Sequence, residues 1–169
     1  MILSIALLVF VTLQRLSELV LASRNTRRLK ARGAYEVGAG HYPLIVALHG
    51  AWLAGLWWLA WDRAASLPLV VAFLAVEALR VWVLLSLGER WTTRIIILPG
   101  APLVRRGPYR FFPHPNYAVV TAEIALLPLV FGLWAYAGAF TALNAAVLFV
   151  RIRAENAALS GLAPPSSRR

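Results

Sequence analysis

The chain has 169 residues, of which 60% are hydrophobic and only 14% are charged. A water-soluble domain usually carries about 25% charged residues, so the composition argues against a soluble protein. The net charge is +10, and the absence of cysteine excludes disulfides and thiolate metal ligands. The length fits one compact domain, which we expect over residues 1–160, followed by a disordered tail over 161–169.

Five segments predict membrane-spanning helices, which need roughly 20 apolar residues each. In chain order they are residues 2–22, 42–61, 67–87, 117–134 and 135–150, the last running on through RIRAENAAL. The first has no basic start and holds Arg15 and Glu18, so we interpret it as a span and not as a signal peptide. The sequence therefore predicts an all-α integral membrane protein with five transmembrane helices.

Basic and neutral connections alternate along these segments. Residues 23–33, 88–116 and the end after residue 150 are rich in arginine, whereas 61–66 and 134–139 carry no net positive charge. Because basic residues collect in cytoplasmic loops, we expect the N-terminus outside and the C-terminus in the cytosol. The same placement between apolar runs favours membrane lipids as partners, and no nucleic acid.

The connection over residues 88–116 is long for a link between helices. Its stretch TTRIIILPGAPLV predicts an extended or hairpin-like segment with a turn at Pro99 and Gly100. Irregular backbone at a membrane must be buried in protein or line a wet cavity. We therefore expect this loop to fold over the helix ends on the cytosolic side and to cap a pocket.

Several ionisable residues lie inside the predicted spans, where they usually face other helices. Arg15 with Glu18, and Glu77 with Arg80, are each three residues apart and thus share a helix face, so we expect local neutralisation. Glu123 has no partner on its own helix. It is expected either to pair with an arginine of another helix or to border a polar cavity.

Two histidines, His41 and His49, lie near and within the second predicted span. Without cysteine or an HExxH pattern we expect no metal site. His41 fits an interfacial position, and His49 fits a donor that packs between helices.

Two motifs carry a family resemblance. The stretch GPYRFFPHPNY (107–117) resembles the GxYxxxRHPxY signature of the isoprenylcysteine carboxyl methyltransferase family. RIRAENAAL (151–159) resembles that family's segment of an arginine, three residues, two glutamates, two further residues and a leucine. The N-terminal RNTRRLKARGAYEVGAGHYPLIVALH is similar to a short bacterial subgroup, some members of which are associated with O-methylation of polyketide lipids such as alkylpyrones and alkylresorcinols.

The resemblance implies an integral methyltransferase of the bacterial cytoplasmic (inner) membrane, with its active site facing the cytosol. Its cofactor would be S-adenosyl-L-methionine (SAM), which leaves as S-adenosyl-L-homocysteine (SAH). Position by position, the implied cofactor-binding residues are Leu103, Val104, Tyr109, His114, Asn116 and Tyr117, and the implied catalytic residues are Arg151 and Glu155.

The chemistry of these residues agrees with that implication. A tyrosine can stack on adenine or present its π face to a sulfonium. Pro113 and Pro115 restrict the backbone on either side of His114, although a proline-punctuated helix start with a packed histidine is an alternative. Arg151 would orient an acceptor oxygen and favour its anion, while Glu155 would hold Arg151 or take the hydroxyl proton.

The chain departs from the family pattern at two positions. Pro113 stands where the family has an arginine, and Asn156 where it has a second glutamate. Because that arginine could hold a carboxylate, its loss favours a phenol or enol of a polyketide lipid over a prenylcysteine carboxylate, unless Arg110 compensates. A small transporter subunit and a non-catalytic lipid-binding scaffold are the alternative functions, and the oligomeric state stays open.

Overall fold

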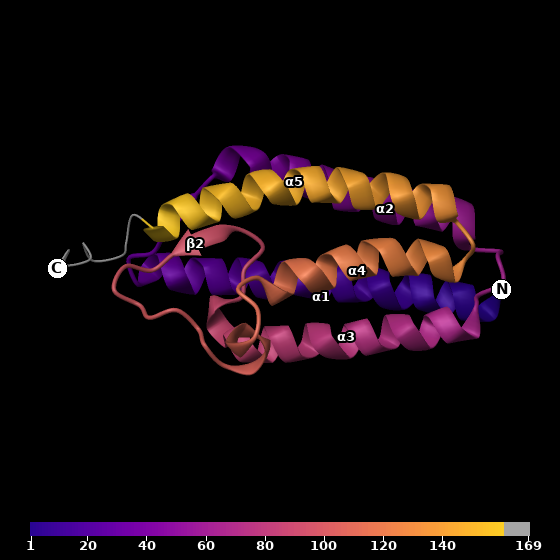
Figure 1. The fold of residues 1–169 in the computed structure, drawn as a ribbon, viewed down its shortest axis with the longest axis horizontal. Helices are drawn as coiled ribbons and strands as arrows, with labels where there is room; N and C mark the ends of the chain where they lie inside the picture. Colours follow the sequence, from indigo (N-terminus) through magenta and orange to yellow (C-terminus); the bar gives the residue numbers. More distant parts are fainter. Residues whose placement is uncertain (161–169) are drawn as a thin grey trace.

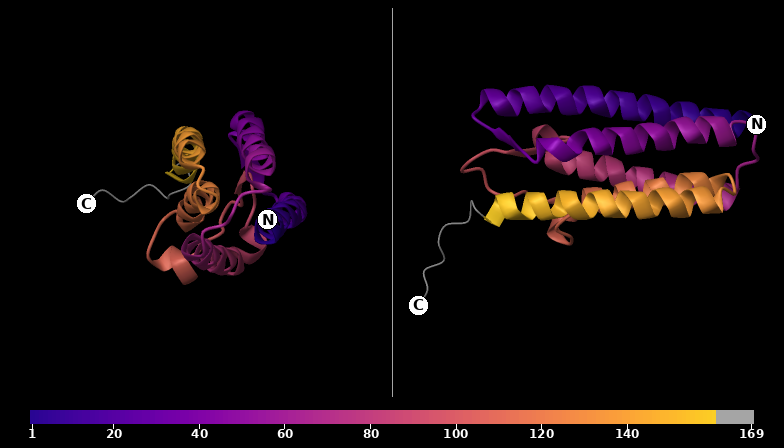
Figure 2. Two further views of the ribbon diagram at one scale, coloured as in Figure 1. Left: turned by 90° about the vertical axis from the view of Figure 1, so that its right-hand side faces the viewer. Right: turned by 90° about the horizontal axis from the view of Figure 1, so that it is seen from above.

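The computed structural model describes residues 1–160 and has five α-helices along one long axis (Figure 1). They are α1 (Ile2–Ala31), α2 (Tyr42–Ala60), α3 (Leu67–Leu87), α4 (Pro115–Val130) and α5 (Trp134–Ser160). Viewed along that axis, α4 lies between α3 and α5, with α1 and α2 across from them (Figure 2). The predicted tail, 161–169, lies outside the described residues.

Four of these helices, α1, α2, α3 and α5, are long and apolar enough to cross a membrane. Their outward faces are apolar as well: Val20, Val71 and Leu85 keep 70%, 68% and 72% of their surface exposed. Apolar surface of this extent is unusual on a monomeric soluble protein and suits contact with lipid. The helices thus support an integral membrane protein. A fifth span over α4, which has 16 residues, stays a prediction.

Two predicted helix boundaries are wrong. α1 continues to Ala31 and does not end at residue 22, so most of the basic 23–33 cluster lies on a helix. α4 covers Pro115–Val130 and not 117–134. Gly132 adopts a φ of 71°, which residues with a side chain rarely adopt, and this left-handed turn separates α4 from α5.

Short elements gather where α1 and α5 finish, which we call the loop end of the bundle (Figure 1). They are β1 (Tyr35–Val37), β2 (Ile95–Ile97) and the 3₁₀ helices η1 (Ala39–His41), η2 (Gly88–Arg90) and η3 (Gly107–Arg110). The long connection is extended at β2, as expected. Its antiparallel partner, however, is β1 from the α1–α2 connection, with Glu36 opposite Ile96, so the segment does not form a local hairpin.

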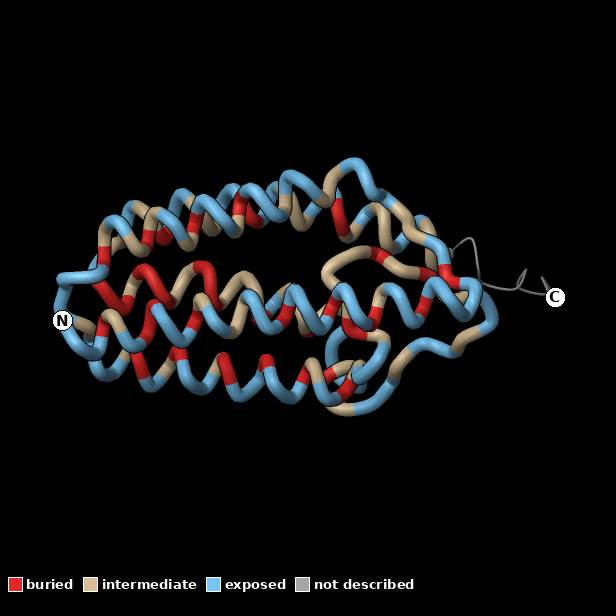
Figure 3. Tube along the Cα trace, turned by 180° about the vertical axis from the view of Figure 1, so that it is seen from behind, coloured by how far each residue is buried: buried red, intermediate tan, exposed pale blue. Residues whose placement is uncertain are grey.

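The apolar core lies toward the opposite end of the bundle, near the N-terminus (Figure 3). Its members come from α1 to α4 and the turn after α4. The most deeply buried are Leu8, Val11, Trp52, Leu56, Ala60, Phe73, Ile124, Leu127 and Val130.

A buried ion-pair network joins α1, α3 and α4 between this core and the loop end. Arg15 lies 3.1 Å from Glu18 and 2.6 Å from Glu123. Arg80 donates to Glu18 through Nε and Nη2, and to Glu123 Oε2 through Nη1 at 2.6 Å. Two arginines thus face two glutamates. Glu123, which is fully buried, pairs with arginines of other helices, one of the two expected alternatives.

The expected pair between Glu77 and Arg80 is wrong. Among the ion pairs of residues 1–160, Arg80 contacts only carboxylates of α1 and α4, while Glu77 accepts a hydrogen bond from Gln14 at 2.5 Å. The guanidinium has five donors in a planar fork, so two carboxylates from neighbouring helices suit it better than one on its own helix. The local Arg15–Glu18 pair does form.

We expect Glu123→Gln to lower the free energy of unfolding by about 3–5 kcal/mol, because the two arginines of the buried network are then left to share the single carboxylate of Glu18. Denaturant titration in mixed micelles measures this. Glu89→Gln is the control, since Glu89 pairs with Arg28 and Arg32 on the exposed surface and should matter little. Equal losses in the two variants would contradict a stabilising network.

A second ionic contact fastens the β1–β2 pair to α1. Glu36 on β1 accepts from Lys30 at 3.0 Å and from Arg94 at 2.5 Å. Partial burial alone would raise the pKa of Glu36, but the hydrogen bonds and charges of Arg94 and Lys30 outweigh it and hold the pKa below its usual value.

Acid should therefore release this contact. Because the folded-state pKa of Glu36 is depressed, its stabilisation is present above the unfolded pKa of about 4.3 and is lost as pH falls through the folded pKa. Hydrogen exchange of the β1 amides should accelerate in the wild type between about pH 5 and pH 3, after correction for intrinsic rates. Glu36→Gln should exchange quickly throughout. A wild-type profile that stays flat would refute this.

Candidate functional site

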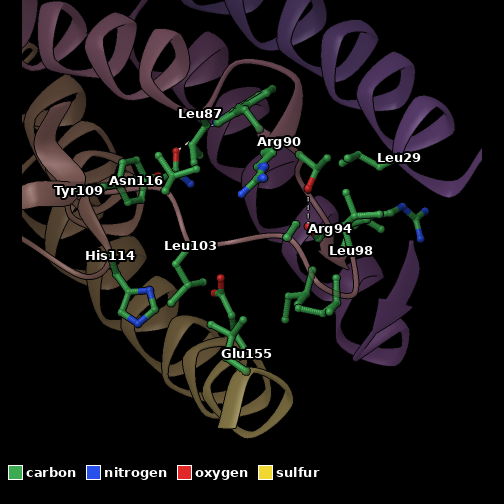
Figure 4. A pocket seen from close by; sticks show the side chains of 18 of the residues that line it. Leu29, Leu87, Arg90, Arg94, Leu98, Leu103, Tyr109, His114, Asn116 and Glu155 are labelled. Carbon is green, nitrogen blue, oxygen red and sulfur yellow. Dashed lines mark hydrogen bonds between the residues drawn. The ribbon is translucent and has the colours of Figure 1, made fainter. Parts of the chain in front are cut away.

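The loop end contains a cavity of about 210 Å³ between the 88–116 segment and the adjoining ends of α4 and α5 (Figure 4). We call it the loop-end cavity. All eight residues that the resemblance singled out line it: Leu103, Val104, Tyr109, His114, Asn116, Tyr117, Arg151 and Glu155. The structure thus brings together residues from both motifs. Their roles in binding a cofactor or in catalysis stay predictions.

The 88–116 segment, which supplies most of this lining, is hydrogen-bonded to α3. Arg106 donates from Nε to the carbonyl of Ser86 at 2.8 Å. The next residue, Gly107, has a φ of 58°, and an added Cβ would come within 2.0 Å of the Ser86 hydroxyl. Leu103 nevertheless keeps 62% of its surface exposed. The cavity is therefore open beside Leu103, and a cap over a bound molecule stays a prediction.

Tyr117 links the two residues predicted to be catalytic. Arg151 is buried and donates from Nε to the Tyr117 hydroxyl at 2.9 Å, and that hydroxyl donates to Glu155 Oε2. Arg151 also donates from Nη1 to the carbonyl of Thr93 at 2.8 Å. The spacing of four residues puts Arg151 and Glu155 on one face of α5, but no direct ion pair joins them within residues 1–160. Glu155 holds Arg151 through Tyr117.

His114 sits at the cap position of α4, where its carbonyl accepts from the amides of Tyr117 and Ala118. Its ring stacks on that of Tyr117, with centroids 5.3 Å apart and planes 22° apart. Neither ring nitrogen has a hydrogen-bond partner within residues 1–160. The imidazole is thus held by its backbone and by stacking, and its polar edge is available to a ligand.

Two further predicted residues keep free donors toward the cavity. Asn116 accepts at Oδ1 from the indole of the buried Trp91 at 3.3 Å, which leaves the side-chain amide N–H groups to donate. Tyr109 lies on η3, and burial raises the pKa of its hydroxyl above the usual value, with a smaller contribution from Glu155. Tyr109 therefore stays neutral and can donate a hydrogen bond.

The sequence reasoning missed other lining residues, chiefly Arg90 and Arg94. Arg90 donates to the carbonyl of Pro102, and Arg94 lies 4.0 Å above the ring of Tyr42. Both had been interpreted only as topology signals. The available clue was that several arginines lie in a connection with irregular backbone. Such backbone at a membrane is either buried in protein or lines a wet cavity.

Arg110, which could have compensated for the missing family arginine, does not line the loop-end cavity. Pro113 lines this cavity, but Arg110 lies 5.8 Å from the ring of Phe111. Positive charge at this cavity comes instead from Arg90, Arg94 and Arg151.

A second cavity, of about 320 Å³, lies deeper between α1, α2, α4 and α5. We call it the mid-bundle cavity. Most of its wall is apolar, with Arg15, Glu18 and Arg80 of the ion-pair network and His49 among the exceptions. It shares five lining residues with the loop-end cavity: Trp91, Thr92, Asn116, Tyr117 and Arg151. The Tyr117–Arg151 contact thus forms part of the wall between the two cavities.

Two bacterial proteins resemble the chain over most of its length. One, from Bacillus subtilis (strain 168), is named "Uncharacterized protein YpbQ" and is 37% identical, covering 90% of this chain and 94% of that protein. The other, named "Uncharacterized protein", from Haemophilus influenzae (strain ATCC 51907 / DSM 11121 / KW20 / Rd), is 29% identical and covers 90% and 92%. No solved structure matches the chain.

A family model agrees with the motifs. The model described as the isoprenylcysteine carboxyl methyltransferase (ICMT) family matches residues 68–161, which include α3, α4, α5 and most of the loop-end cavity. Members of that family are integral membrane methyltransferases. The narrower resemblance to alkylpyrone and alkylresorcinol methyltransferases remains a proposal. From the matched residues and the converging motifs, the chain belongs to the isoprenylcysteine carboxyl methyltransferase family.

Proposed function

We propose that this protein is a SAM-dependent O-methyltransferase of the bacterial cytoplasmic membrane that acts on a lipophilic acceptor, preferably a phenol or enol of a polyketide lipid. The loop-end cavity would hold the methyl donor on the cytosolic side. The mid-bundle cavity would hold the acceptor, which enters from the bilayer. One observation carries the proposal: a cavity with both charged and apolar lining residues meets a largely apolar cavity at Tyr117 and Arg151.

The side chains of the loop-end cavity fit SAM. The donor's carboxylate suits the positive charge of Arg90 and Arg94. Its amino group suits an acceptor nitrogen on the unpartnered edge of His114, and its ribose hydroxyls suit the free amide donors of Asn116. Apolar side chains and the ring of Tyr109 suit adenine.

SAM, when bound, supplies an electrophilic methyl group on a sulfonium and departs as a neutral thioether. The protein positions the acceptor and manages its proton. Arg151, close to the boundary of the two cavities, favours the anionic form of an acceptor oxygen. The Tyr117 hydroxyl touches both Arg151 and Glu155, so it can take the acceptor's proton while passing its own to Glu155. Alignment of the reactants supplies much of the remaining rate enhancement.

The charges at the boundary support the proposed acceptor class. A carboxylate is already ionised at neutral pH, whereas a phenol with a pKa near 10 needs a base and a nearby cation. The Arg151–Tyr117–Glu155 chain provides both. Pro113 stands in place of the family arginine, and that arginine is the group that would best hold the carboxylate of an acceptor in addition to the carboxylate of SAM. These features support a phenol or enol over a prenylcysteine carboxylate.

Binding of SAH separates an enzyme from a transporter subunit or a scaffold. Calorimetric titration of the full chain in lipid nanodiscs should give saturable one-to-one binding. His114→Ala should weaken it about 10-fold, because a hydrogen-bonding ring is lost from the cavity. Glu89→Gln, at an exposed residue that lines neither cavity, should leave it unchanged. A folded protein that shows no saturable binding would refute the methyltransferase proposal.

Turnover tests the proton path. Labelled SAM is incubated with the protein and total lipid extract, and the lipid that gains the label is identified. Tyr117→Phe, Arg151→Ala and Glu155→Gln should each slow transfer by about 10²–10⁴-fold. Tyr117→Phe should bind SAH within a few-fold of wild type, because its ring can still stack on His114. Near-normal rates in all three variants would exclude these roles.

A further inference from the structure

Among the polar groups of the mid-bundle cavity that the proposed chemistry does not use, His49 has a ring nitrogen without a partner in the described part of the chain. His49 lies on α2 within a wall that is mostly apolar. Its Nδ1 is 2.8 Å from the carbonyl oxygen of Ile45, one turn earlier on the same helix. A carbonyl only accepts, so Nδ1 carries the proton, and Nε2 of the neutral ring keeps a lone pair.

That lone pair has no partner within residues 1–160. Three other polar side chains of the same wall have partners: Arg15 and Arg80 bind glutamates, although Arg15 Nε is unpartnered among the described residues, and Asn144 donates to Thr121 at 3.2 Å. Polar groups inside a membrane protein are costly and usually find partners in the bundle. His49 was expected to pack as a donor between helices. Within residues 1–160 it donates to a carbonyl of its own helix, and its side chain lines the cavity with Nε2 unpartnered.

The position of His49 along α2 sets its distance from the reacting end. Tyr42, seven residues earlier, hydrogen-bonds the Thr93 hydroxyl at 3.0 Å, and the Thr93 carbonyl accepts from Arg151. Tyr42 therefore marks the level of the Tyr117–Arg151 boundary. With a rise of 1.5 Å per residue, His49 lies roughly 10 Å deeper in the bundle.

We propose that His49 Nε2 accepts a hydrogen bond from a hydroxyl of the acceptor, roughly 10 Å from the oxygen that is methylated. The inference rests on the proposed function and narrows its substrate class: the acceptor is an amphiphile with a second hydroxyl on its hydrophobic part, and not a plain alkyl phenol. A site built to bind a hydroxyl discriminates strongly against analogues that lack it, because its own polar group is then left unpaired.

Three alkylphenol probes test this inference. Their chains carry, about 10 Å from the phenolic oxygen, a hydroxyl, a methyl ether or only hydrogen. Equilibrium binding is measured for the full chain in phosphatidylcholine nanodiscs, with and without SAH. Wild type should bind the hydroxyl probe about 10-fold tighter than either other probe. The methyl ether probe tests whether the hydroxyl acts as a hydrogen-bond donor, because an ether oxygen can accept a hydrogen bond but cannot donate one.

Variants of the wall assign the preference to His49. His49→Leu should bind the three probes alike, and His49→Gln, which retains an acceptor oxygen, should restore part of the preference. Leu53→Ala, one turn away in the same wall, should weaken all three probes similarly. Comparing ratios between variants cancels the partitioning of each probe into the bilayer.

The outcomes separate this inference from the proposed function. SAH affinity should be unchanged in His49→Leu, because His49 does not line the loop-end cavity. If SAH fails to bind wild type, the proposed function falls. If SAH binds, but wild type shows no hydroxyl preference, binds no probe, or keeps the preference in His49→Leu, only the role of His49 is overturned.

Discussion

The pairing of Arg15 and Arg80 with Glu18 and Glu123 is the contact on which the rest of the bundle depends. In a bilayer, apolar helix faces gain little from meeting one another, since lipid tails are equally apolar. Unpaired charges are costly there, so the arginines and glutamates dictate which helices adjoin and in which register. The network fixes α4 against α1 and α3, and thereby places the first turn of α4 beside the loop end.

The same charges also shape the interior. Arg15, Glu18 and Arg80 border the mid-bundle cavity, while the apolar core fills the bundle farther toward the N-terminal end. The bundle is therefore filled at one end and hollow at the other. The hollow end is where the first turn of α4, with Asn116 and Tyr117, meets α5. A chain of modest length thus combines a stable core with two adjoining cavities.

The spacing of residues in the sequence predicted the features that depend on a single helix, such as which side chains share a helix face. The four-residue separation of Arg151 and Glu155 put both on one face of α5, and the helical hairpin α4–α5 returned them to His114 and Tyr117. Long apolar runs likewise located four of the helices.

Contacts between segments that lie far apart in the sequence could not be predicted from local spacing. The pairing of β2 with β1 joins residues about 60 positions apart, and three-residue strands carry too little pattern to reveal it. Arg94 was assigned only to topology for this reason. The sequence also could not show that Arg80 pairs with Glu18 of α1 and Glu123 of α4 and not with the glutamate of its own helix, because this pairing depends on which helices adjoin. The left-handed turn at Gly132, which shortened α4, was not anticipated either.

The shortness of α4 has a consequence for the surrounding bilayer. Its 16 residues extend about 24 Å, less than the roughly 30 Å of a hydrocarbon core. If α4 crosses the membrane as predicted, a segment this short would be matched by local thinning of the membrane or by polar groups that reach inward from the interface. Headgroups and water would then approach the level of Asn116 and Tyr117 on the α4 side. An amphiphile could keep its polar end near the interface while its hydrocarbon part stays in the membrane interior.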